Sequence, residues 1–339
     1  MLTAERLTAQ LLAGPPAADP VAVAGRLLAI QAQDARGARL AVRSRTTGLG
    51  ASDVDRALTQ DRTLVVTWLN RGTLHLVRAE DYPWLQALTT PQIATGNRRR
   101  LGQEGVSEAA AAQGVAVIER ALADEGPLTR HELRDRLDAV GVPTARQALV
   151  HLLMLASLRG LIVRGPMKGA TQAFVLVRDW LGEPEPVDRD AALADLARRY
   201  LAGHGPASDR DLAAWAGVRL GDARAGLAAI AGELSAGEDG LMDLAGREPA
   251  APLPPPRLLG PFDPLLHGWA SREWVVGDRP GVVTSNGVFR PIALAGGRAV
   301  ATWRLDAGRV RLSAFGRLAR SDAAALERDA QDVTRFLAA

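Results

Sequence analysis

The middle of the chain repeats itself. Gly126-Pro127 returns 79 residues later as Gly205-Pro206, and residues 129–132 (Thr-Arg-His-Glu) return as 208–211 (Ser-Asp-Arg-Asp). In both copies a hydroxyl residue stands three places before an acidic residue, which is the pattern that caps the first turn of a helix. Self-similarity at a fixed spacing is typical of tandem modules. We therefore expect two copies of one small unit in this region.

The first copy predicts three helices followed by a hairpin. The helices are expected at 109–124, 129–137 and 144–158, and the strands at 161–164 and 173–177 around a turn at 165–169. Three helices and a hairpin form a winged helix, a relative of the helix-turn-helix motif. The second copy has matching predicted helices at 191–201 and 220–234.

The flanking regions extend this organisation. The first 100 residues suggest a third, divergent copy, with helices expected at 3–13, 19–31, 36–46 and 52–60 and strands at 63–69 and 72–77. A proline-rich linker at 249–256 precedes strands expected at 280–287, 288–294, 299–303 and 309–314 and a helix expected at 322–337. Asn286-Gly287 and Gly296-Gly297 are typical hairpin turns.

These patterns predict an α+β fold of tandem winged-helix modules with a C-terminal small β-barrel or sheet domain. The expected domains are residues 1–105, 106–185 and 186–248 for the three modules and 257–339 for the C-terminal domain. A chain of 339 residues is too long for one ordinary domain, which agrees with this division.

Composition excludes several kinds of chemistry. The chain has no cysteine, and its five histidines show no metal-ligand spacing, so we expect neither disulfides nor a metal site. No phosphate-binding loop, nucleophile elbow, secretory signal or long apolar run is present, so we expect a cytoplasmic protein without a cofactor and without a membrane partner. Lys168 is the only lysine among 41 basic residues. Arginine suits phosphate recognition, but a GC-rich genome would produce the same excess, so the basic composition supports nucleic acid binding only weakly.

One short segment identifies a family. Ile30-Gln31-Ala32-Gln33-Asp34, followed by residues 38–41, resembles the Gln-x-Gln signature of the AlkZ-like winged-helix DNA glycosylases. Further stretches that resemble this family are 70–76, 161–169, 180–182, 199–201, 258–269 and 286–291. The YcaQ-like relatives have Gln-x-Asp at this site, so Gln33 places the chain with the Gln-x-Gln branch, which includes self-resistance enzymes against DNA-alkylating natural products.

The resemblance implies three tandem winged helices and a β-barrel around a basic concave surface for double-stranded DNA. It implies a monofunctional DNA glycosylase that cleaves the N-glycosidic bond of N7-alkylated or bulky purine adducts, unhooks interstrand cross-links and acts as a monomer on DNA carrying alkylated bases. Two alternatives remain open: a non-catalytic winged-helix transcription regulator and a protein-interaction scaffold.

The proposed chemistry suits neutral amides. Alkylation at N7 gives the guanine a positive charge, so an enzyme needs only to place water and stabilise the developing charge on the sugar. The expected catalytic residues are Gln31 and Gln33, with Asp34 as the competing water-activating base. Residues two apart diverge by about 200° on a helix but share a face in an extended segment, so the glutamines act jointly only if the preceding helix ends near Ile30. No lysine lies near the motif, so we expect no lyase step and an abasic product. A bulky or cross-linked N7 adduct would not easily enter a snug pocket, so we expect an open, groove-facing site.

Arginines and polar residues elsewhere are the expected DNA contacts, namely Arg71, Thr73, His75, Arg43, Arg164, Lys168, Arg272, Asn286 and Arg290. Each has a structural alternative. His75 lies in an alternating strand and fits a half-buried structural histidine, Arg71 fits a residue that binds carbonyls at a strand turn, and Lys168 fits a solvated wing tip. Asp263 and His267 are expected to be structural rather than catalytic.

Overall fold

The computed structural model describes residues 1–237, 240–279 and 281–339. Both helices and strands occur along the described chain, which confirms the α+β class expected from the sequence. The residues form two compact units. The terminal unit comprises Met1–Val54, Leu193–Trp215 and Arg219–Ala339, and the middle unit comprises Asp55–Ala192 and Ala216–Val218.

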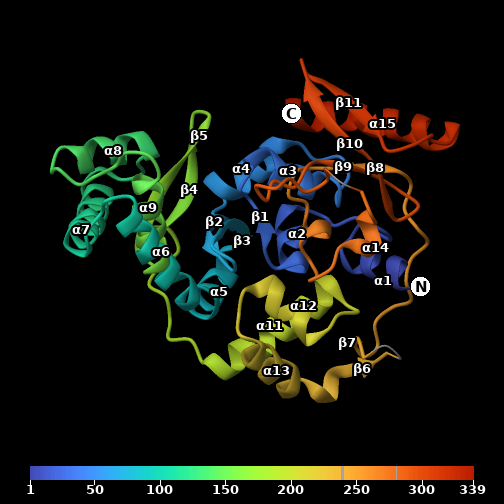
Figure 1. Cartoon of the computed structure of the whole chain (residues 1–339), viewed down its shortest axis with the longest axis horizontal. Helices are drawn as coiled ribbons and strands as arrows, with labels where there is room; N and C mark the ends of the chain where they lie inside the picture. The colour runs from blue at the N-terminus through green and yellow to red at the C-terminus, as the bar shows by residue number, and fades with distance from the viewer. Residues whose placement is uncertain (238–239, 280) are drawn as a thin grey trace. The chain divides into compact units, whose positions relative to one another are not determined.

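The middle unit combines an antiparallel sheet with packed helices. Its strands lie in the order β3-β2-β4-β5. Figure 1 shows α7, α8 and α9 gathered beside the β4–β5 hairpin. The elements, with α4 beginning in the terminal unit, are α4 (Ala51–Thr59), β2 (Leu64–Leu69), β3 (Thr73–Arg78), η1 (Ala79–Asp81), α5 (Tyr82–Thr89), α6 (Pro91–Gln103), α7 (Glu108–Glu125), α8 (Arg130–Asp138), α9 (Ala148–Leu158), β4 (Ile162–Lys168), β5 (Thr171–Leu176) and α10 (Val177–Trp180).

The terminal unit is built around a four-stranded antiparallel sheet in the order β11-β10-β9-β8. The last helix, red in Figure 1, packs against β8 and β11. The elements that lie wholly or mainly in this unit are α1 (Leu2–Ala9), α2 (Pro20–Leu27), β1 (Ile30–Gln31), α3 (Ala35–Arg43), α11 (Arg189–His204), α12 (Asp209–Ala216), α13 (Leu220–Ala229), η2 (Ala231–Glu233), β6 (Leu234–Ala236), β7 (Met242–Leu244), β8 (Arg257–Leu259), η3 (Pro264–Leu266), α14 (Glu273–Val276), β9 (Ile292–Ala295), β10 (Arg298–Asp306), β11 (Arg309–Ala314) and α15 (Arg320–Ala338).

The internal repeat is visible in the hydrogen bonds of each copy. Thr129 and Glu132 form a reciprocal capping box, and Ser208 and Asp211 exchange the equivalent bonds. In each copy the residue after the Gly-Pro pair bridges to the hairpin that follows the third helix: Leu128 exchanges two backbone bonds with Phe174, and Ala207 does so with Met242. The two copies therefore share their internal connections as well as their sequence pattern.

Several predicted boundaries were wrong: the helix expected at 3–13 ends at Ala9, the helix expected at 220–234 ends at Ala229, and the strand expected at 288–294 begins at Ile292. The helix expected at 19–31 ends at Leu27, because Leu28 adopts a positive φ of 65° that a right-handed helix does not accommodate. The strand expected at 280–287 is a turn in its described part, closed by a bond from the Gly287 amide to the Thr284 carbonyl, while Pro280 lies outside the described residues. The turn expected at 165–169 is shorter, because β4 continues to Lys168 with a register shift after Arg164.

Within the three described stretches of chain, no helix combines the length and the apolar character that crossing a membrane requires.

Candidate active site

The Gln31–Gln33 segment lies outside any helix. Helix α2 ends at Leu27, Ile30 and Gln31 form β1, and Asp34 has extended backbone angles (φ −107°, ψ 115°). The helix thus ends before Ile30, which is the condition that joint action of the two glutamines requires. The side chain of Gln31 is buried, with 7% of the residue exposed, whereas Gln33 is exposed. The segment therefore offers one buried amide and one at the surface.

Asp34 links this segment to helix α3. Its Oδ1 accepts a hydrogen bond of 2.7 Å from the Gly37 amide and caps the helix. Gly37 is required here, since a Cβ at this position would lie 2.4 Å from the carbonyl oxygen of Pro261. The loop at 260–263 therefore packs directly on the first turn of α3, and the cap fixes the direction of the Asp34 carboxylate.

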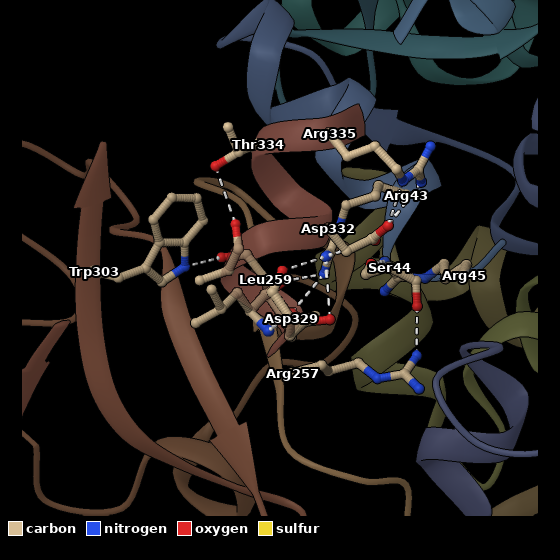
Figure 2. Close-up of polar contacts among 12 residues, drawn as sticks. Arg43, Ser44, Arg45, Arg257, Leu259, Trp303, Asp329, Asp332, Thr334 and Arg335 are labelled. Carbon is tan, nitrogen blue, oxygen red and sulfur yellow. Dashed lines mark hydrogen bonds and ion pairs between the residues drawn. The ribbon is translucent and has the colours of Figure 1, made fainter. Parts of the chain in front are cut away.

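The other end of α3 is held by a buried arginine. Figure 2 shows the Arg43 guanidinium between two carboxylates of α15: its nitrogens lie 2.8 Å from Asp329 Oδ2 and 3.1 Å from Asp332 Oδ2. It also donates to the Leu258 carbonyl at 2.9 Å, and only 4% of the residue is exposed. A phosphate contact by Arg43, which the sequence predicted, would need both ion pairs to break. We therefore leave Arg43 out of the DNA contacts proposed below.

Three other predicted DNA contacts belong to the terminal unit. Asn286 is exposed within the turn at 284–288, and Arg290 is exposed two residues after that turn. Arg272 is half-buried; its Nε donates to the Leu266 carbonyl at 3.2 Å and its guanidinium lies 5.2 Å from the centre of the Phe289 ring. Asp34 and Arg290 line the same hollow, of about 340 Å³, so the structure brings together two predicted residues that are far apart in sequence.

The remaining predicted contacts lie on the middle unit. Arg71 is exposed and Thr73 is half-buried. Arg164 packs its guanidinium 5.4 Å from the Trp68 ring centre and 5.3 Å from that of Phe174, and burial lowers its pKa to about 10, so it remains a cation at neutral pH. Lys168 is exposed at the hairpin tip, with its Nζ 2.6 Å from Glu132 Oε1.

His75 is more deeply buried than the sequence suggested, with 2% of the residue exposed. Its Nδ1–H donates to the Thr73 carbonyl at 2.9 Å, because a carbonyl can only accept. Burial, and secondarily the charge of Arg71, lowers its pKa to about 3. His75 is therefore a neutral imidazole at physiological pH.

This burial predicts a stability change with pH. The unfolded chain takes up a proton on His75 below about pH 6.5, whereas the folded state does not, so this contribution to stability is present above that pH and is lost as the pH falls toward 3. Between pH 7.5 and 5.5 the free energy of unfolding should fall by about 1.4 kcal/mol through this group. Urea denaturation of the wild type and His75→Asn at both pH values measures it. An equal pH dependence in the two proteins would contradict the prediction.

The protein is a DNA repair enzyme of the AlkZ-like DNA glycosylase family, since the model described as "DNA glycosylase AlkZ-like" matches residues 24–336. It is 29% identical to an interstrand DNA cross-link repair glycosylase from Streptomyces sahachiroi, over 95% of this chain and 91% of that protein. The solved structure of the S. sahachiroi DNA glycosylase AlkZ superposes with a TM-score of 0.81 at 26% identity, covering 99% of this chain and 95% of that one. The resemblance inferred from the sequence is thereby confirmed, and the regulator and scaffold alternatives are not favoured.

Sequence reasoning missed most residues of the hollow beside Asp34. Its walls come from α3, from the loops at 261 and 290–291, from β10 and from the end of α15. Arg36 stands within the motif region, and Leu40, Pro261 and Pro291 lie in stretches that resemble the family, so their positions were a signal. The other walls meet these residues through tertiary packing alone.

Proposed function

We propose that this enzyme hydrolyses the N-glycosidic bond of N7-alkylated and bulky purine adducts in double-stranded DNA, and that it unhooks interstrand cross-links. The observation that supports the proposal is that helix α2 ends at Leu27, so that Gln31 and Gln33 lie in a non-helical segment. The S. sahachiroi relative, an interstrand DNA cross-link repair glycosylase, supports the cross-link substrate.

In the proposed mechanism the lesion supplies much of the driving force. The cationic N7-alkylpurine leaves with the electrons of the C1′–N9 bond and becomes neutral, while an oxocarbenium-like centre develops on the sugar. A glutamine carbonyl oxygen holds the attacking water, whose oxygen bonds to C1′. The proton of that water passes to the Asp34 carboxylate or to solvent, because the cap occupies only one of the two carboxylate oxygens, Oδ1. The product is an abasic site.

The proposed DNA contacts are Arg71, Thr73, His75, Arg164, Lys168, Arg272, Asn286 and Arg290. Asn286 and Arg290 are exposed, as direct phosphate contacts require, and Arg164 is a cation at neutral pH. His75 would act through its position in β3 rather than through a charge.

We also propose that residues 1–105, 106–185 and 186–248 are winged-helix modules, that residues 257–339 form a small β-barrel or sheet domain with a terminal helix, and that the enzyme acts as a monomer in the cytoplasm. The helices α7, α8 and α9 with the β4–β5 hairpin support the module at 106–185. The equivalent series α11, α12 and α13 with β6 and β7 supports the module at 186–248.

The decisive experiment is base release from a duplex that carries one N7-methylguanine. We expect free 7-methylguanine and an alkali-labile abasic strand, and we expect separation of the two strands of an N7–N7 cross-linked duplex on a denaturing gel. Binding without either product would contradict the proposed function.

A further inference from the structure

A preformed hollow adjoins the proposed catalytic segment. It has a volume of about 340 Å³, and Asp34 and Arg36 line it together with residues of the C-terminal sheet and helix α15. Ligand sites for small organic groups start at roughly this size. The space is therefore far larger than a water molecule or a methyl group needs, and it opens beside the residue that we propose to act on the substrate water.

The lining of this hollow is mostly apolar, formed by Leu40, Pro261, Pro291, Trp303, Leu305 and Leu337. These side chains offer a surface to rings and alkyl groups rather than to the sugar or phosphates of DNA. Arg36, Arg290 and Arg304 add positive charge to it beside the Asp34 carboxylate, and all three arginines are exposed. An apolar lining with three exposed cations at its rim is suited to an apolar group that is attached to a polyanion.

The walls of the hollow are fixed before any ligand arrives. The Trp303 indole donates to the Leu259 carbonyl at 2.9 Å, as Figure 2 shows, and the Trp303 amide donates to the Pro291 carbonyl at 3.1 Å. The Pro261 wall is in direct contact with Gly37 of α3. Because these bonds hold three sides in place, the hollow is a receptor of defined size.

We propose that this hollow receives the apolar substituent at N7 of a bulky alkylated purine and thereby sets the size preference of the enzyme. The inference rests on the function proposed above and names the part of the lesion that selects it. Arg36 and Arg290 bind the phosphates beside the lesion, while the substituent packs on Leu305, Leu337 and Trp303. A methyl group at N7 is too small to reach this surface, so only bulky lesions use it.

The test fills the hollow with a larger side chain. Leu305→Trp is the variant and Leu312→Trp is its matched control, since both leucines lie in the β10–β11 hairpin but Leu312 is 38% exposed and does not line the hollow. Two duplexes serve as probes, one with N7-(naphthylmethyl)guanine and one with N7-methylguanine. A 2′-fluoro sugar at the lesion blocks excision, so that dissociation constants can be measured.

We expect Leu305→Trp to weaken binding of the naphthylmethyl duplex by about tenfold or more, and to change binding of the methyl duplex by less than about twofold. Leu312→Trp should change neither. Leu337→Trp, which obstructs the hollow from α15, should reproduce the selective loss, and thermal melts report whether each variant is folded.

Several results would overturn the inference. They are an equal loss on both duplexes in a folded variant, the same loss in Leu312→Trp, or unchanged binding of the naphthylmethyl duplex by both filling variants. If the wild type excises 7-methylguanine but the filling variants do not discriminate, the proposed function survives and this inference fails. If the wild type excises nothing, the proposed function fails, and the ratio of the two dissociation constants still decides the role of the hollow.

Discussion

Replacing Gln31 and Gln33 together with alanine should lower the rate of 7-methylguanine release by about 1,000-fold or more, because the variant loses both groups proposed to place water and stabilise the sugar. DNA affinity should change by less than about threefold, since neutral amides contribute little to the phosphate contacts that dominate binding. Single-turnover base release and fluorescence anisotropy with the same duplex measure the two quantities separately.

The control for this variant is Gln113→Ala, which removes an exposed glutamine from α7 and should leave excision unchanged.

Asp34→Asn separates the proposed role of Asp34 as a base from its role as the cap of helix α3. An asparagine oxygen still accepts from the Gly37 amide, so the cap is kept while the base is lost. Excision at the wild-type rate by the double alanine variant would show that the glutamines are not the catalytic pair.

The sequence predicted correctly those local features that depend only on residues a few places apart in the chain. The capping box at Thr129 and Glu132 depends on two residues three places apart, and the structure has both of its bonds. The repeat predicted an equivalent cap at Ser208 and Asp211, which is also present. That the helix ends before Ile30 could be stated only as a condition, because no residue type in the sequence indicates the positive φ of Leu28 that ends it.

Features that depend on distant segments could not be predicted. The burial of His75 follows from how its strand is covered, and alternation along that strand suggested only half-burial. Arg43 is of a residue type that commonly binds DNA phosphates. Its guanidinium instead binds Asp329 and Asp332, which lie nearly 300 residues away in the sequence. The hollow beside Asp34 is likewise a product of packing between α3, β10 and α15.

Asp263→Ala should have the largest effect on stability. Arg45 and Asp263 form a doubly hydrogen-bonded ion pair with both distances at 2.9 Å, and the side chains of both are completely buried. Asp263 also accepts from the Leu265 amide at 3.0 Å, as expected for a structural residue. Removing the carboxylate leaves a buried guanidinium without its counter-charge, which costs about 3–5 kcal/mol. The midpoint and slope of urea unfolding give the free energy directly.

The matched control is Asp306→Ala, which breaks an exposed pair with Arg311 at 3.9 Å and should cost less than about 1 kcal/mol. The comparison of the two variants tests whether the buried charge of Arg45 needs the Asp263 carboxylate for its stabilisation. The Arg45 guanidinium also donates to the backbone carbonyl of Gln10 at 2.8 Å and to the side-chain oxygen of Gln10 at 3.2 Å. Those neutral acceptors satisfy hydrogen bonds but not the charge. Equal losses in the two variants would therefore mean that Gln10 or entering water stabilises Arg45 as well as the carboxylate does, and that the loop at 260–263 is held against α3 by packing rather than by this ion pair.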